Sequence, residues 1–398
     1  MANSILTPTA VTREALRILH QKLNFVGNIN RTYDDSFAKT GAKIGDSLKI
    51  RLPNEYVVRT GPTLSAQDTS EISTTLQVAT QKGVDLNFTS VDLTLSLDDF
   101  SKRVLDPAMA VLAANIEADA LSMMSDVYNN VNNIGSTANF RALMNSRKVL
   151  NDSLAPMDSN RSVLLNTQDN VDLVDALKGL FQDSTAIKEQ YREGSMGRTG
   201  GYDFYENTLI QNSTTGTAAA ATGYTVNGAV TANGSTQVVL AAGSTTFKKG
   251  DIITFVGTNR VHPESKADTG TLQQFVVNAD YAGGAGTINI SPAIYTSGGR
   301  QNVVAAGIAN GVAVAKVGGA SAIYKPSLAF HKDAFAFATA DLVMPQGVDF
   351  SSRQVMDGIS MRIVRQYDIN NDKFPCRLDV LYGYKTIRPQ LACRILSN

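Results

Sequence analysis

Cysteine and histidine are scarce in this sequence of 398 residues, which holds two of the first and three of the second. Cys376 and Cys393 are too few for a disulfide framework, and we expect both to be small buried side chains. His20, His262 and His331 lie far apart and share no motif, which gives no support to a metal site or a histidine base. We therefore expect no metal ion and no cofactor.

Long apolar runs and an excess of charge of either sign are also missing. No apolar run reaches the ~18 residues that a membrane-spanning helix needs, and the N-terminus lacks the basic and apolar regions of a secretory signal. We expect a protein made in a reducing cytoplasm, without membrane contact. The 36 Lys and Arg balance the 36 Asp and Glu, which argues against a protein whose main task is to grip nucleic acid.

Recognisable catalytic motifs are absent. The glycine-rich stretch 194–201 lacks the Gly-Lys-Ser/Thr of a phosphate-binding loop, so we interpret it as a turn or an interface loop. The aspartate pair 34–35 lies in an expected loop, and the pair 98–99 is placed to cap a short helix over 97–103. No serine lies in a Gly-x-Ser-x-Gly motif. We expect no catalytic, cofactor-binding or metal-binding residues, and no enzyme.

An amphipathic helix is predicted over residues 8–25, where Pro8 suits the first turn. Leu16, Leu19 and Leu23 fall on one apolar stripe, and the basic residues lie away from it. Such an arm must cover an apolar surface, and a neighbouring subunit is one candidate to supply it.

A second, longer helix is the clearest element of the sequence. Asp106 is placed to cap it, and Pro107 fits its first turn. Apolar residues then recur at spacings of three and four from Met109 to Val131. About 25 residues at ~1.5 Å each predict a rod of roughly 37 Å.

Strand-like segments surround a polar stretch before this helix. Residues 47–52 and 56–59 are predicted strands, 61–75 is poor in large apolar residues, and 84–89 and 91–95 are predicted strands again. The pattern predicts a long two-stranded excursion with a polar tip. A ribbon of this kind is only marginally stable alone, so we expect it to lie on another surface.

The second half changes composition twice. Residues 138–212 mix predicted helices (139–150, 168–180 and 184–191) with a strand at 162–165. Charged residues then thin out to 10 of the 108 positions in 213–320, which is about half the chain average of 18%. Strand-like runs between turn residues predict a small all-β module there, with strands at 237–241, 251–256, 272–278 and 287–291. Strand-rich character follows over 321–398, so we interpret the module as an insertion.

Charge is unevenly distributed along the first third of the chain. Residues 1–60 carry 9 basic and 5 acidic residues, a net +4, and residues 61–130 carry 3 basic and 10 acidic residues, a net −7. These charges are either solvated faces or complementary surfaces that meet between neighbouring subunits. The sequence leaves both interpretations open.

The order of these parts, together with several short motifs, resembles a known family. The motifs are LTP at 6–8, REAL at 13–16, QKGV at 81–84, LTLSLDDF at 93–100, KGDIITFVG at 249–257 and YGYKTIRP at 382–389. The chain resembles the tailed-phage capsid fold first described for phage Hong Kong 97, and more closely the coat protein family of Salmonella phage P22. The resemblance runs in order along nearly the whole chain.

The resemblance implies an α+β capsid fold with an inserted all-β, barrel-like domain. It divides the chain into an N-terminal arm (1–32), an E-loop region (33–95), a spine helix with P-domain (96–135), an A-domain (136–212), an inserted I-domain (213–320), and closing strands of the A- and P-domains (321–398). The module is short of charge, so ionic contacts known for the family's I-domain are not carried over. Covalent Lys–Asn cross-linking is not expected either.

The function implied by the resemblance is that of a major capsid protein. Hexamers and pentamers would form an icosahedral shell around double-stranded DNA, held by non-specific contact, with a scaffolding protein and a portal protein as partners. The protein would reside in the virion, and in the host cytoplasm during assembly. The alternatives are a phage or bacterial surface adhesin with 213–320 as a sugar-binding module, and a hydrolase whose site matches no motif. The module has few aromatics, which disfavours sugar stacking.

Overall fold

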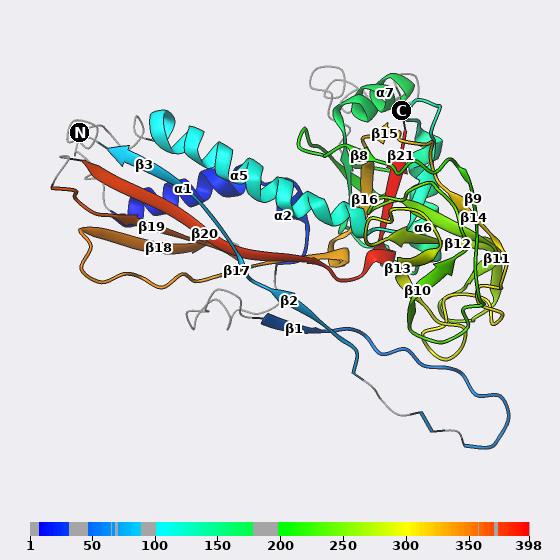
Figure 1. Cartoon of the computed structure of the whole chain (residues 1–398). Coiled ribbons are helices and arrows are strands. Elements are labelled where there is room, and N and C mark those ends of the chain that lie inside the picture. The colour runs from blue at the N-terminus through cyan, green and yellow to red at the C-terminus, as the bar shows by residue number, and fades with distance from the viewer. Residues whose placement is uncertain are drawn as a thin grey trace. The chain divides into compact units, whose positions relative to one another are not determined.

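The computed structural model describes residues 8–31, 47–64, 66–67, 71–88, 101–177, 198–356, 358–369 and 373–397 (Figure 1). They fall into two compact units. The first comprises Met1–Arg51, Ser73–Leu121 and Phe335–Ile387, and the second comprises Leu52–Ile72, Ser122–Ala334 and Arg388–Asn398. The predicted strand at 91–95, the predicted helix at 184–191 and both aspartate pairs lie outside the described residues. Among the residues described, no helix is long and apolar enough to span a membrane.

The first unit packs helices on a sheet. Its strands run β17-β20-β19-β18, and β3 pairs with β20 antiparallel, from Phe374 opposite Phe88 to Tyr382 opposite Thr80. The bounds are β3 Thr80–Phe88, β17 Phe335–Ala340, β18 Phe350–Met356, β19 Ile359–Arg365 and β20 Phe374–Thr386. Phe335, Phe337 and Tyr382 are almost completely buried, and so are their neighbours Ala336 and Leu381. Since successive side chains of a strand point to opposite faces, both faces of the sheet are covered here.

The predicted arm is helical and its apolar surface lies within its own unit. Helix α1 (Pro8–Lys22) packs against β18, β19 and α5 (Asp106–Leu121), and the short helix α2 (Phe25–Asn28) follows it. Leu16 and Leu19 are at most 1% exposed. The stripe is therefore confirmed, whereas the suggested neighbouring subunit is not needed to bury it.

The long helix has other limits than predicted. A π-helical turn over Ser101–Leu105 precedes α5, and a 3-10 segment over Ser122–Asp126 follows it. Asp106 therefore lies inside a continuous helical stretch and does not cap it. Val131 belongs to strand β4 (Asn130–Asn132). It is buried there, which explains why the apolar residues continue at helix-like spacing past the end of the helix.

The excursion is a ribbon of two strands, but its second strand was not predicted. Strand β1 (Ser47–Arg51) pairs antiparallel with β2 (Ser73–Gln77), which lies partly in the stretch that was taken as a polar tip. Two threonines and the buried Leu76 suit this strand. Residues 56–59, predicted as a strand, form no strand in the structure.

The second unit contains a six-stranded sheet in the order β4-β21-β16-β5-β7-β6. Its further strands are β5 Arg161–Leu165, β6 Arg198–Thr199, β7 Tyr202–Glu206, β16 Ser327–His331 and β21 Ala392–Leu396. Helix α6 (Phe140–Asp152) packs on β21, β4 and β16, and helix α7 (Thr167–Leu177) contacts α6. Asn139 caps α6, since its side-chain oxygen accepts from the Ala142 N–H at 2.9 Å. The predicted helix at 139–150 and strand at 162–165 are confirmed to within two residues.

The described end of the glycine-rich stretch is a tight turn. Gly200 and Gly201 join β6 to β7, and both have positive φ angles, of 60° and 83°. A two-residue hairpin of this kind needs residues that adopt left-handed backbone angles. The prediction of a turn is confirmed for residues 198–201.

A second six-stranded sheet covers most of the charge-poor region, in the order β10-β13-β12-β11-β14-β9. The strands are β9 Ala221–Thr225, β10 Ser235–Leu240, β11 Ile252–Val261, β12 Asp268–Val277, β13 Gly286–Ile294 and β14 Ala313–Lys316. A bridge between Val226 and Leu240 joins the first strand to the last, so the sheet closes on itself. Four of these strands were predicted, and the short strands β9 and β14 were missed.

The interior of this closed sheet is a single apolar cluster. Phe247, Phe255 and Phe275 are at its centre, each at most 1% exposed. Strand β8 (Ser213–Thr214) pairs with β15 (Ile323–Tyr324), so the chain enters and leaves the closed sheet at adjacent positions. This is the connectivity that an insertion requires.

Candidate assembly surfaces

Apolar side chains are concentrated at the end of the excursion. Tyr56, Val58 and Leu64 are 55%, 89% and 84% exposed, and Val57 is also exposed. Isolated exposed apolar residues are ordinary, but four of them within nine positions form a patch. Tyr-Val-Val has strand-forming side chains, and these side chains are left uncovered by the described part of their own chain.

One side chain, that of Gln67, makes hydrogen bonds to the backbone of this patch. The Gln67 amide accepts from the Val57 N–H at 2.9 Å and donates to the Val57 carbonyl at 2.5 Å. The two bonds reproduce those that a neighbouring strand would make. No backbone N–H or carbonyl of Tyr56 or Val58 has a hydrogen bond within the described part of the chain.

The outward face of α5 carries no charge. Between Pro107 and Leu121 the charged residues are Glu117 and Asp119. The buried Glu117 carboxylate accepts from the backbone N–H groups of Phe25 and Val26. Glu117 is buried and Asp119 is paired, so the face that includes Val111, 60% exposed, is uncharged. The polar group on this face is the Asn115 amide, which is exposed and donates to the Val111 carbonyl at 2.9 Å. A helix face with exposed apolar groups and no charge is a candidate for a further partner.

Asp119 joins α5 to the sheet of the first unit. Its carboxylate accepts from the Tyr382 hydroxyl at 2.5 Å and pairs with the Lys82 ammonium at 2.7 Å. Burial and the adjacent carboxylate both raise the pKa of Tyr382 above its usual range. The hydroxyl therefore stays protonated and keeps donating to Asp119.

A buried arginine connects the base of the closed sheet to β21. The Arg394 guanidinium donates to the Gly250 carbonyl at 2.9 Å, and burial lowers its pKa to about 10. Next to it, the buried Asp251 carboxylate accepts from the backbone N–H groups of Lys248 and Gly216. Gly250 and Asp251 belong to the KGDIITFVG motif, whose role in the fold is thus to join the closed sheet to β21.

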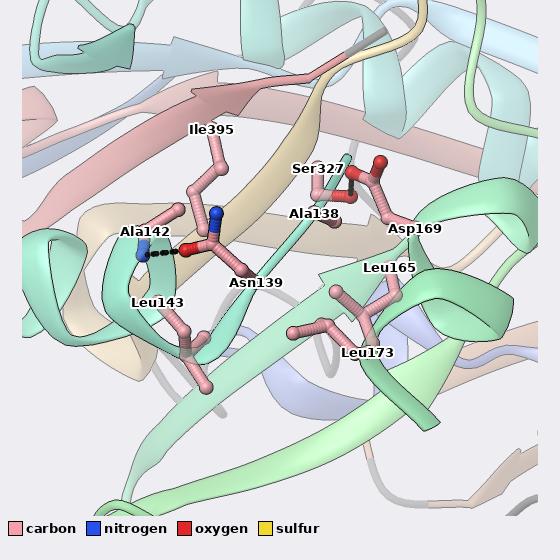
Figure 2. Close-up of a pocket in the computed structure, with 9 residues that line it drawn as sticks. All are labelled: Ala138, Asn139, Ala142, Leu143, Leu165, Asp169, Leu173, Ser327 and Ile395. Atoms are coloured by element: carbon pink, nitrogen blue, oxygen red, sulfur yellow. Dashed lines mark hydrogen bonds between the residues drawn. The ribbon is translucent and has the colours of Figure 1, made fainter. Parts of the chain in front are cut away.

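A small cavity lies between α6, α7 and the sheet of the second unit, as Figure 2 shows. It is lined by Ala138, Asn139, Ala142, Leu143, Leu165, Asp169, Leu173, Ser327 and Ile395. Its volume is about 10 Å³, which is at most the space for one water. The cavity is therefore too small for a substrate or a cofactor.

Asp169 is the titratable group of this cavity. One carboxylate oxygen accepts from the Ser327 hydroxyl at 2.5 Å, and the other has no partner among the described residues. Burial raises the pKa of Asp169 from its usual value to about 6. Asn166 accepts from the Asp169 N–H at 2.7 Å, which fixes the start of α7.

The histidines do not come together. His331 is buried and its Nε2 lies 3.1 Å from an Asp158 carboxylate oxygen, whereas His262 accepts from the N–H groups of Glu264 and Ser265. The side chain of His20 is outside the described residues. Within the part of the chain that the structure describes, no three His, Cys, Asp or Glu side chains are placed to hold a metal ion.

The two cysteines are buried and unpaired, as predicted. Burial raises the pKa of both the Cys376 and the Cys393 thiol to about 12. Both are thiols at neutral pH, and neither has the low pKa of a nucleophilic cysteine.

Comparison with protein families gives a match that covers nearly the whole chain. The family model of the P22 coat protein, gene protein 5, matches residues 29–395. No curated protein sequence matches the chain.

Several solved phage structures are similar at low identity. That of Mycobacterium phage Che8 is 13% identical, with 94% of this chain and 90% of that chain covered and a TM-score of 0.48. The capsid of Ralstonia phage GP4 is 9% identical, with 94% and 90% covered and a TM-score of 0.43. The family assignment rests on the match over residues 29–395. The chain belongs to the P22 coat protein family, and it is a major capsid protein of a tailed bacteriophage with the mixed α+β fold of Hong Kong 97-like capsids.

Proposed function

We propose that copies of this coat protein form hexamers and pentamers, and that these build an icosahedral shell around double-stranded DNA. The observation that supports this most directly is the exposed apolar patch of Tyr56, Val57, Val58 and Leu64. A patch that its own chain leaves uncovered is typical of a protein-binding surface. In a shell of identical subunits, closed symmetry supplies every copy with the same partner surface.

The patch is suited to backbone pairing with a neighbouring copy. Alternate residues of a strand turn their N–H and carbonyl groups to opposite edges. Gln67 occupies the edge at Val57, so in a strand the groups of Tyr56 and Val58 would lie on the other edge. An incoming strand would pair with that edge and cover the apolar side chains at the same time.

The uncharged outer face of α5 is a second surface that we assign to contacts in the shell. Among the described residues of α5 this face carries no charge, so burying its apolar groups removes no charge from water, and the Asn115 amide keeps its bond to the Val111 carbonyl.

Further parts of the proposal come from family membership. We assign 1–32 to an N-terminal arm, 33–95 to an E-loop, 96–135 to a spine helix and P-domain, 136–212 to an A-domain, 213–320 to an I-domain, and 321–398 to closing strands. Assembly takes place in the host cytoplasm with a scaffolding and a portal protein, and DNA is contacted non-specifically. The chain acts structurally and has no enzymatic activity. The pairing of β8 with β15 supports the boundaries of the inserted domain.

The structure gives less support to the alternative function, a surface adhesin that binds sugar. Sugar rings stack on exposed aromatic side chains, but five of the six aromatics in the module lie in its apolar core: Tyr224, Phe247, Phe255, Phe275 and Tyr281. Tyr295 is half-buried, and the Arg300 guanidinium lies over its ring at 4.6 Å. We therefore do not propose sugar binding.

The experiment uses two substitutions at one exposed position. Val58→Asp places a charge in the proposed interface and should block shell assembly. The free energy of unfolding of the subunit should stay within about 0.5 kcal/mol of the wild-type value, because the side chain is exposed. Val58→Thr keeps the β-branched shape and should still assemble. Electron microscopy and sedimentation of the chain co-expressed with its scaffolding protein give the readout.

Two results would contradict the proposal. Shells formed by Val58→Asp at wild-type yield would show that the patch is not an assembly surface. A large loss of subunit stability in the same variant would show that Val58 serves the fold of its own chain.

A further inference from the structure

Three Asn-Gly pairs occur in the chain, and all lie in the turns of the closed β sheet: 227–228, 233–234 and 310–311. The glycines have φ angles of 96°, 85° and 75°, which glycine adopts without strain at the third position of a turn. The turn conformation therefore explains why glycine follows asparagine at each of the three places. It is also the pair in which the backbone amide can most easily attack the preceding side chain, because glycine adds no steric hindrance.

In two of the pairs, hydrogen bonds hold both the asparagine carboxamide and the backbone N–H of the following glycine. The Asn233 oxygen accepts from the Thr296 N–H at 2.8 Å, and the Gly234 N–H donates to the Ile294 carbonyl at 2.8 Å. The Asn310 oxygen accepts from the Gly228 N–H at 2.7 Å. The Gly311 N–H donates to the Val226 carbonyl at 2.8 Å. Each carboxamide is fixed, and each nucleophilic nitrogen is engaged as a donor.

Asn227 differs from the other two. Its side chain is exposed and has no hydrogen-bond partner among the described residues, so its carboxamide carbon can approach the next amide. The Gly228 nitrogen is restrained by a single bond, to the Asn310 side chain across 82 positions. A hydrogen bond from an N–H favours its protonated state, and attack requires that the proton be lost.

We propose that Asn227 is a latent site of deamidation, and that the Asn310 carboxamide suppresses the reaction by holding the Gly228 N–H. In the reaction the Gly228 nitrogen loses its proton and bonds to the Asn227 side-chain carbonyl carbon. The bond from that carbon to the side-chain nitrogen breaks, and ammonia leaves. Water then opens the five-membered ring to aspartate or isoaspartate. The product adds a negative charge to a turn in the part of the chain that is poorest in charge.

The test compares wild type with Asn310→Ala after ageing of the purified full-length protein at mildly alkaline pH. Peptide mapping by mass spectrometry measures conversion at residues 227 and 233 separately. Asn310→Ala should accelerate conversion at Asn227 by about fivefold, the order of effect of one neutral hydrogen bond, and should leave Asn233 unchanged. Asn310→Asp keeps an acceptor oxygen and should keep Asn227 as slow as in wild type.

The internal comparison separates this mechanism from unfolding. Equal acceleration at Asn227 and Asn233 would mean that the variant loosened the whole sheet, and it would overturn the proposal. Unchanged conversion at Asn227 in Asn310→Ala would overturn it as well.

Discussion

Asp169 is the residue whose burial has the clearest consequence for stability. Its pKa is about 6 in the folded protein and about 4 in an unfolded chain. Between these values the folded state binds more protons than the unfolded state, so this group lowers the stability as the pH rises from about 4 to about 6. Above pH 6 the full cost of the buried charge is present.

Asp169→Asn should therefore stabilise the protein at pH 7 by on the order of 2 kcal/mol, because the amide carries no charge and can still accept from Ser327. Near pH 3.5 the two proteins should be equally stable. Urea unfolding of both at a series of pH values provides the measurement. A constant difference across the whole range would show that the Asp169 carboxyl is not the titrating group.

At the level of single residues, the sequence predicted which side chains are buried better than it predicted their hydrogen-bond partners. Both cysteines and the leucine stripe of α1 were predicted correctly, because apolar side chains reveal burial by type and by spacing. Asp169 and Arg394 could not be identified, since their partners lie 158 and 144 positions away. The neighbouring sequence does not distinguish a buried acid at the start of a helix from an exposed one that interacts favourably with the helix dipole.

At the level of elements, the arm is a part of the folded subunit. Removing residues 1–27 takes away Leu16, Leu19, Phe25 and Val26, all at most 1% exposed, and uncovers α5 and β18. A fully buried side chain of this size contributes roughly 2 kcal/mol, so the truncated chain should fail to fold stably. Circular dichroism and thermal melting give the readout, and the exposed substitution Arg13→Ala should leave both unchanged.

A stably folded truncated subunit that fails only in assembly would contradict this expectation. It would return the arm to the role first suggested by the sequence, which is to cover a neighbouring subunit.

The excursion and the long helix show where element prediction fails. The ribbon was predicted, but residues 56–59 have strand-forming side chains and no strand partner in their own chain, so propensity alone misplaced a strand there. Apolar spacing extended the helix to Val131, although the segment after Asp126 is buried as a loop and a strand. Periodicity reports which face is buried and does not report which element buries it.

At the level of the whole molecule, the order of parts predicted more than any single motif. An arm, a ribbon, a long helix, a mixed sheet, an inserted β region and closing strands together indicated a capsid subunit, and the family match over residues 29–395 confirms it. The resemblance implied a barrel-like inserted domain, and the bridge between Val226 and Leu240 closes its sheet. Which strands meet at the closure could not be predicted, because β9 was missed. Surfaces that meet other copies follow from what the folded chain leaves uncovered.

Cryo-electron microscopy of the chain co-expressed with its scaffolding protein tests the central claim most directly. The account predicts closed icosahedral shells in which the Tyr56–Val58 backbone of each subunit lies against a strand edge of a neighbouring copy. Monomers under all assembly conditions, or shells in which this segment faces solvent, would contradict it.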